Sequence, residues 1–156
     1  MAACVDLRDI RLWGIEAKLE NVPDVGEARL SYALNADLDV QHSQENSILL
    51  VLGTYTLNVE AVPPHEETAG AIEASDAENT PVASVNFRLN ALFEVEREPK
   101  DEPFSEAELS AFGETTGQFA LYPYARELVA DMTGRMGLPP LHLGVMRLHL
   151  DSRNSD

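Results

Sequence analysis

The chain has 156 residues and 44% hydrophobic content, a length and composition typical of one globular domain, so wholesale disorder is excluded. Its formal net charge of −16 repels phosphate backbones and excludes nucleic acid as the expected partner. No apolar run is long enough to insert into a membrane, and no secretory leader is expected. The single cysteine, Cys4, has no partner within the chain for a disulfide, which favours a cytoplasmic location.

Two segments alternate apolar and polar side chains with period two, the pattern of a half-buried β-strand, and an earlier segment carries the pattern with one change of phase. The first strand is predicted over Ile10–Leu19, where the apolar phase changes from Ile10 and Leu12 to Trp13, Ile15, Ala17 and Leu19 near Gly14. That change predicts a bulge or bend. The second strand is predicted over residues 28–41, and another over residues 83–96.

A further strand, predicted over Ile48–Val62, lies between these and is apolar on both faces in its first half. Ile48, Leu50 and Leu52 share one face there. Residues 63–81, rich in proline, alanine and acids, have no apolar period and are expected to form a solvated loop. Residues 1–150 therefore form one domain, and residues 151–156 form a polar tail.

Two helices are predicted after the strands. Ser105 and Glu108 have the spacing of a capping box that opens a short helix. A longer helix is expected with Pro123 in its first turn, an i, i+4 pair of Asp131 and Arg135, and a stop at the glycines and prolines of residues 134–140. Its apolar stripe has the helical period and consists of Leu121, Tyr124, Ala125, Leu128, Val129, Met132 and Met136.

The order of four strands and then helices predicts an α+β domain, in which a four-stranded antiparallel sheet carries its helices on one face. One helical layer leaves the other sheet face open, including the apolar Ile48, Leu50 and Leu52. Subunit association is the simplest way to cover that face, so we predict a homo-oligomer.

The sequence carries no recognisable catalytic motif: phosphate-binding loop, nucleophile elbow, and zinc or redox spacing are all missing. His142 and His149 do not match a metal pattern, so no metal or other cofactor is expected. Tyr122, Arg126 and Glu127 on the longer helix could suggest chemistry. A structural role, tying the helix to neighbouring strands or to another subunit, is the preferred interpretation. We therefore predict that the protein is not an enzyme.

The longer helix and the segment after it also resemble the SecB-like chaperone family. The matching residues are Leu121-Tyr122-Pro123-Tyr124-Ala125-Arg126-Glu127, then Thr133-Gly134-Arg135 and Leu138-Pro139-Pro140-Leu141. This resemblance implies a protein that holds unfolded polypeptides without ATP. It also implies a tetramer built as a dimer of dimers.

In the family the client groove lies between a crossover loop and the loop that leaves the long helix. By this resemblance, one wall of the groove is the exit segment, which we define as residues 138–146. The other wall is the crossover loop, which would be residues 38–46. Methionine and leucine side chains can repack against varied clients. Burial in the core is the alternative for each residue. The candidate client-binding residues are Leu38, Val40, Leu138, Pro140, Leu141, Leu143, Val145 and Met146.

Export-type members dock on the translocase motor through acidic positions, which here fall at Gly14, Lys18 and near Asn86. Export-type members also dock through a C-terminal tail, and the tail expected here, residues 151–156, is short. The acidic loop and the amino-acid sequence of the longer helix look more like those of the members that accompany toxin–antitoxin systems, so an antitoxin is the expected client. Two alternatives stay open: an export chaperone for preproteins, and an adaptor that binds a folded partner without holdase activity.

Overall fold

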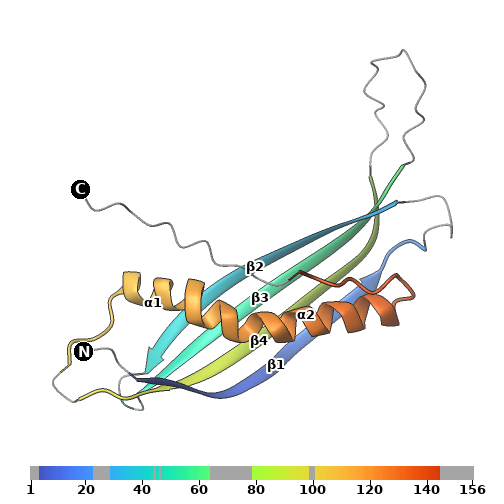
Figure 1. Ribbon diagram of the computed structural model, residues 1–156. Coiled ribbons are helices and arrows are strands. Elements are labelled where there is room, and N and C mark those ends of the chain that lie inside the picture. Colours follow the sequence, from blue (N-terminus) through green and yellow to red (C-terminus); the bar gives the residue numbers. More distant parts are fainter. Residues whose placement is uncertain are drawn as a thin grey trace, which may run out of the picture.

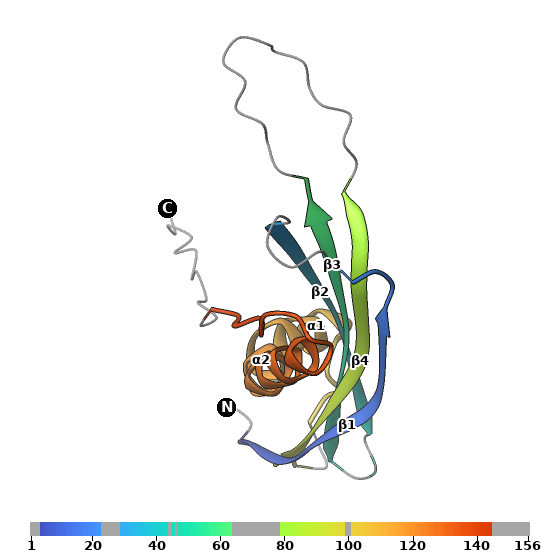
Figure 2. The same ribbon diagram turned by 90° about the vertical axis from the view of Figure 1, so that its right-hand side faces the viewer.

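The computed structural model describes residues 4–22, 29–43, 45, 47–63, 79–98 and 101–144. Four strands form one antiparallel sheet: β1 (Val5–Leu19), β2 (Arg29–Ser43), β3 (Ile48–Val62) and β4 (Thr80–Val95) (Figure 1). Helix α1 (Glu106–Phe112), the π-helical turn η1 (Gly113–Gly117) and helix α2 (Gln118–Arg135) follow. The helices lie on one side of the sheet, so the predicted α+β architecture is confirmed (Figure 2).

The strand order is β1-β4-β3-β2, so the first strand pairs with the last. The connection that crosses the sheet therefore joins β1 to β2. The assignment of residues 38–46 as a crossover is wrong: Leu38 and Val40 lie inside β2, which pairs with β3 as a hairpin. Local alternation predicted this strand correctly, but the crossover depends on pairing between distant segments that alternation cannot reveal.

The core lies between the sheet and the helices, and most of it comes from the two central strands. Alternate side chains of β3 and β4 point to the helices and are buried, as period-two alternation requires. Helix α2 adds Leu121, Ala125 and Val129, each 0% exposed. The buried strand residues include Leu49, Val51, Tyr55, Leu57, Val59, Val85, Phe87, Leu89, Ala91 and Phe93.

Two irregularities interrupt the pairing of β1 with β4, one between Leu7 and Asp9 and one between Leu12 and Gly14. The predicted change of phase near Gly14 is thus confirmed. Trp13, expected in phase with Ile15, is instead the extra residue of the second bulge. When the Asn90 amide is oriented to satisfy both groups, its oxygen accepts a hydrogen bond from the Trp13 indole at 2.8 Å.

The helical run fits closely against the sheet because glycines stand where it crosses β2 and β3. A Cβ on Gly113 would lie 2.7 Å from a Val40 methyl carbon, and one on Gly117 would lie 2.9 Å from a methyl carbon of Val51. Any larger residue would clash at these two sites. The turn between them is π-helical, and the run continues from α1 to α2.

Helix α1 opens as predicted: the Ser105 side chain accepts from the Glu108 backbone, and the Glu108 carboxylate accepts from the Ser105 backbone. The position predicted for Pro123 is wrong, because α2 begins at Gln118 and Pro123 lies inside it. Proline removes one backbone hydrogen bond there, and the buried face on both sides keeps the helix continuous.

The end of α2 agrees with its sequence signals. Gly137 has φ +76°, a left-handed conformation that favours glycine, and the Leu138 amide donates to the Thr133 carbonyl at 3.0 Å. Arg135 and Asp131 form the predicted ion pair at 2.8 Å. Most of the predicted 63–81 loop and the whole 151–156 tail fall outside the described residues.

Candidate functional site

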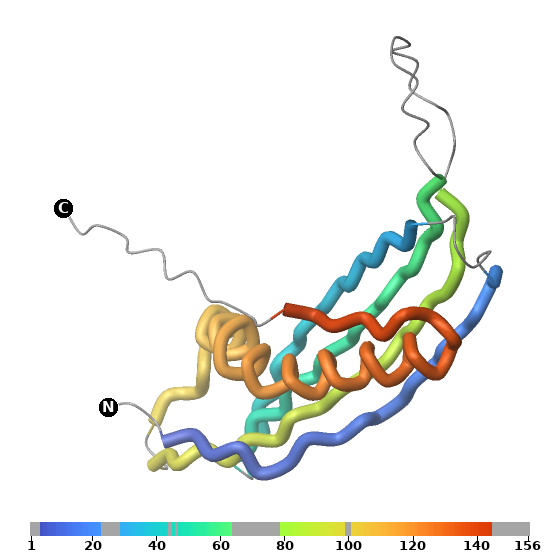
Figure 3. The backbone as a smooth tube through the Cα atoms, turned by 45° about the vertical axis from the view of Figure 1, so that its right-hand side comes forward, coloured from blue at the N-terminus to red at the C-terminus, as the bar shows by residue number. Residues whose placement is uncertain are grey.

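After α2 the chain turns back and runs alongside this helix on the side of β2 (Figure 3). The described part of the exit segment, residues 138–144, has no regular secondary structure. Its far end is tied to α2, because the Tyr122 hydroxyl donates to the Gly144 carbonyl at 2.6 Å. Near its start, the Tyr32 hydroxyl of β2 lies 3.5 Å from the Pro139 carbonyl. We call this side the β2 flank of α2.

A buried threonine fixes the middle of the exit segment. Thr133 is 0% exposed, and its hydroxyl donates to the Val129 carbonyl at 2.8 Å. The same oxygen accepts from the Leu141 amide at 2.9 Å. The Thr133 hydroxyl therefore makes two hydrogen bonds, one within α2 and one to the backbone of the exit segment. Together they fix the position of the exit segment against the helix.

The structure places the candidate client-binding residues mostly against the core. Leu138 is 5% exposed, and Leu141 and Leu143 are half-buried and pack on the core cluster. Pro140 is exposed. Val145 and Met146 lie outside the described residues.

Leu38 and Val40 are not at a loop. A Leu38 methyl lies 3.3 Å from where a Cβ on Gly53 would stand, in the same space as a Leu121 methyl, and Val40 lies below Gly113. Both are half-buried. The structure thus gathers Leu138, Leu141 and Leu143 on the β2 flank, and places Leu38 and Val40 on the sheet below the helices.

The family-motif residues divide between the two flanks of α2. Leu121 is fully buried, and Tyr122 anchors the exit segment. Arg126 and Glu127 are exposed, and neither makes an ion pair within the described ranges, so no tie to a strand is seen for them there. Tyr124, expected in the buried stripe, is 49% exposed.

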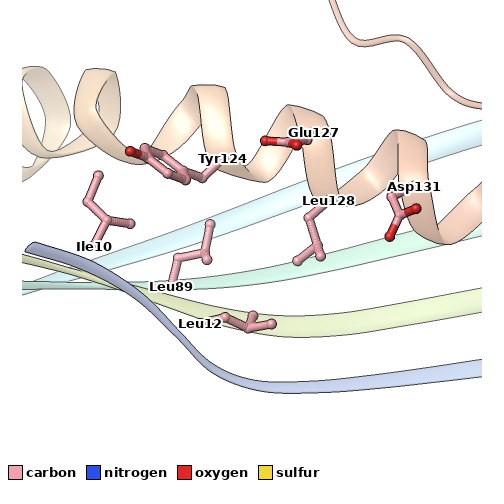
Figure 4. A pocket seen from close by; sticks show the side chains of 7 residues that line it. All are labelled: Ile10, Leu12, Leu89, Tyr124, Glu127, Leu128 and Asp131. Atoms are coloured by element: carbon pink, nitrogen blue, oxygen red, sulfur yellow. The ribbon is translucent and has the colours of Figure 1, made fainter.

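A cavity lies on the opposite flank, between α2 and β1, with a volume of about 290 Å³. We call this side the β1 flank. Figure 4 shows strand side chains below and helix side chains above, with Leu128 pointing from the helix to the strands. The residues that line the cavity are Ile10, Leu12, Leu89, Tyr124, Glu127, Leu128 and Asp131.

The β1 flank carries large apolar side chains that the described chain covers only in part. Leu12 is 47% exposed, Ile15 40% and Leu19 43%. All three lie on β1, an edge strand of the sheet, and Leu12 also lines the cavity under α2. Sequence reasoning missed this flank, although the irregular apolar phase of β1 and the position of Tyr124 beside Glu127 are signals for it.

At the other end of the helical run, an aromatic and cationic cluster holds the chain before α1. The Arg97 guanidinium lies 4.0 Å from the centre of the Phe104 ring, and His42 meets the same ring edge-on at 5.0 Å. Burial and then the nearby Arg97 charge lower the pKa of His42. The cluster therefore favours a neutral imidazole and serves as a packing anchor.

The described residues lack the features of two further kinds of site. None of their helices combines the length and apolarity that a membrane crossing needs. Among the same residues, histidine, cysteine and carboxylate side chains nowhere gather in a group that could hold a metal ion.

Comparison with known proteins gives a consistent result. The SecB-like chaperone Rv1957 of Mycobacterium tuberculosis strain H37Rv is 34% identical over 148 residues, which cover 94% of this chain and 80% of that protein. The SecB-like chaperone MT2006 of strain CDC 1551 has the same identity over 149 residues and the same coverage. No protein-family model matches.

A solved structure has the same fold. It contains the M. tuberculosis Rv1957 SecB-like chaperone in complex with a ChAD peptide from the Rv1956 HigA1 antitoxin. The TM-score is 0.75 at 32% identity, and the match covers 94% of this chain and 93% of that one.

Proposed function

This chain belongs to the SecB-like chaperone family, and on that premise we propose that it is an ATP-independent holdase for an aggregation-prone antitoxin. The similar structure with an antitoxin peptide bound supports this client class, since it matches 94% of this chain. A holdase has to recognise unfolded chains by what they share, which is exposed apolar side chains and extended backbone.

One observation carries the proposal: α2 and β1 leave large apolar side chains in contact with solvent. Phe119 and Tyr124 on α2 and Leu12, Ile15 and Leu19 on β1 are all at least 40% exposed. Several large exposed apolar side chains on neighbouring elements are typical of an interaction site. On the β2 flank, the exit segment is the second candidate surface for a client, and Pro140 is exposed there.

We also propose that the protein works in the cytoplasm, has no catalytic activity and assembles as a homo-oligomer. The sheet face away from the helices supports association. Ile48, Leu50 and Leu52 are only half-buried there, and Trp13 is 71% exposed. A self-complementary patch of this kind is buried when two copies associate about a two-fold axis. The tetramer that we propose, a dimer of dimers, contains such two-fold contacts.

The holdase activity is tested by diluting guanidinium-unfolded citrate synthase into buffer without nucleotide and following light scattering. We expect the purified chain to slow aggregation at a stoichiometric ratio. The antitoxin preference is tested with a fluorescent HigA1 ChAD peptide, for which we expect saturable binding by anisotropy. Unchanged aggregation contradicts the holdase; slowed aggregation without peptide binding contradicts the antitoxin assignment.

Variants of the exit segment test its part in the site. Leu141→Asp with Leu143→Asp is expected to weaken client binding, and circular dichroism reports whether the fold survives, because both leucines pack on the core. Pro140→Ser changes only an exposed position and leaves the core intact. If both variants hold clients as well as the parent protein, the β2 flank takes no part.

The export alternative finds less support. Gly14, Lys18 and Asn86, at the positions of the acidic docking residues, bring no carboxylate. Gly14 pairs with Arg88 across the sheet, and Lys18 lies 3.6 Å from Glu20. Saturable binding to a translocase motor would reverse this preference.

A further inference from the structure

We infer that His42, Phe104 and Arg97 form an acid-sensitive latch, which holds helix α1 on the sheet and releases it when the His42 imidazole takes up a proton. The inference goes beyond the proposed function, because a holdase needs no change of pH in order to act. It concerns the start of the helical run, away from the two flanks of α2.

The latch joins the sheet to the chain that enters α1. His42 lies near the end of β2, on the same face as Val40. Its ring meets the Phe104 ring in a T-shaped contact, with the ring centres 5.0 Å apart. Phe104 directly precedes Ser105, the N-cap residue of α1. An apolar contact at this position fixes the angle at which the chain enters a helix, so His42 acts on the orientation of α1.

Arg97 holds the same ring from the segment after β4. Its guanidinium carbon lies 4.0 Å from the centre of the Phe104 ring, a cation–π contact. The guanidinium also donates to the Glu102 carbonyl and lies 4.0 Å from the Asp101 carboxylate. The Arg97 side chain is only 17% exposed. It is thus held from several sides, so it cannot easily move away from a new positive charge on His42.

The surroundings of His42 make the neutral imidazole its stable form. Burial, and then the charge of Arg97, lower the pKa of His42 from its ordinary value of 6.5. The carboxylates on the neighbouring segments are Glu45 in the β2–β3 turn, Asp101 before α1 and Glu108 in the first turn of α1. They do not reverse this shift, since Asp101 pairs with Arg97 and Glu108 caps its own helix.

The direction of the shift fixes the sign of the pH dependence. The closed latch binds the imidazole proton less tightly than the released one does. The contribution of the latch is therefore complete above pH 6.5 and is lost as the pH falls below that value. The capping box does not titrate in this window, because hydrogen bonds from Ser105 lower the pKa of Glu108 below its ordinary 4.5.

Helix α1 is the part of the helical run that a weakened latch can release. None of its seven residues is buried, whereas α2 buries four of its own, and segments with few buried contacts open at the lowest cost. The π-helical turn η1 interrupts the regular hydrogen-bond pattern between the two helices. Release of α1 would uncover Phe93, which meets the Phe112 ring at 5.1 Å, and so add apolar surface at this end of the sheet.

Titration of the imidazole by NMR tests the latch in the unaltered protein. We expect the His42 ring carbon signal, identified by its loss in His42→Phe, to titrate with a midpoint below pH 6.5. In Arg97→Gln the midpoint should move up toward 6.5, because one of the two causes of the shift is removed while burial remains. A midpoint at or above 6.5 in the parent protein overturns the inference, since the cluster would then attract the proton.

Hydrogen exchange tests the release of α1. Mass spectrometry of a peptide covering residues 101–113 gives its protection, corrected for the intrinsic pH dependence of exchange. We expect protection in the parent protein to fall about three- to tenfold from pH 7.5 to pH 5.5. A released imidazole with a pKa of 6.5 sets a ceiling of about elevenfold at pH 5.5. His42→Phe keeps an aromatic ring against Phe104 and takes up no proton, so its protection should not respond to pH.

His142→Phe is the matched control, because it makes the same substitution at an exposed position of the exit segment. It should keep the fall in protection of the parent protein. Unchanged protection of residues 101–113 in the parent protein, or an equal fall in His42→Phe, overturns the latch. The aggregation assay run at pH 7.5, where the latch is closed, tests the proposed function separately, so that function can stand when the latch fails.

Discussion

At the scale of single residues, Tyr55 is the least satisfied polar group in the described core. It is 3% exposed and stacks on Phe87 with ring centres 4.9 Å apart, and its hydroxyl has no hydrogen-bond partner there. Burial raises its pKa from 10.0 to about 12. The folded state therefore binds the phenolic proton more tightly than the unfolded chain does.

We expect Tyr55→Phe to leave stability at pH 7 unchanged or raised by up to about 1 kcal/mol, because it removes an unpaired buried hydroxyl. The contribution of the neutral hydroxyl is complete below pH 10 and is lost as pH rises toward 12. Thermal unfolding at pH 7 and pH 11 should thus show a smaller alkaline loss in Tyr55→Phe than in the parent. Tyr124→Phe, at an exposed position, is the control. A marked loss of stability at pH 7 would mean that the hydroxyl has a partner.

At the scale of elements, local signals predicted more than long-range ones. The capping box of Ser105 and Glu108, the Asp131–Arg135 pair and the stop at Gly137 each depend on a few neighbouring residues, and all are present. Pro123 shows the limit of such signals. A proline is a local signal for a helix start, but the buried face before and after it continued the helix.

The π-helical turn η1 depends on glycine at its end. In Gly117→Ala the new methyl would lie 2.9 Å from a methyl carbon of Val51, a side chain with 0% exposure that cannot move into solvent. We expect a loss of about 1–3 kcal/mol in urea denaturation, the usual cost of overpacking.

Gly134→Ala is the matched control for this variant. It lies in α2, where a new methyl would meet Pro140 at an ordinary 3.6 Å. We expect it to raise stability by about 0.5–1 kcal/mol, since alanine is the better helix former. Equal effects of the two substitutions would show that the contact with Val51 does not decide the outcome.

At the scale of the whole molecule, the sheet face away from the helices sets the expected assembly. We expect light scattering to give a mass that is a multiple of the protomer. Leu50→Lys should lower it, because the substitution puts a charge among the half-buried Ile48 and Leu52. Ala107→Lys, which makes the same charge change at an exposed position of α1, should leave the mass unchanged. A monomeric parent protein would contradict the proposed assembly.

The fold class was predictable from this sequence, whereas the position of the site was not. Alternation showed four strands and the helical period showed α2, but neither shows that β1 lies beside β4. The cavity joins Ile10 and Leu12 of β1 to Leu128 of α2, and only the strand order brings these residues together. The exit segment was predicted as irregular chain after the helix stop, from the local signals of its prolines and glycines, and residues 138–144 are irregular. Its role as a wall of the client groove stays a prediction.

The pairing of the first strand with the last has a consequence for folding during synthesis on the ribosome. Val5 pairs with Val95, and Leu19 with Ala83, so β1 has no partner until nearly the whole sheet has left the ribosome. Loop closure over such a distance makes folding slow, and the waiting strand is apolar. During synthesis this chain therefore exposes an apolar strand that can aggregate, the same hazard that we propose it suppresses in its clients. We expect its early folding intermediates to need protection from aggregation themselves.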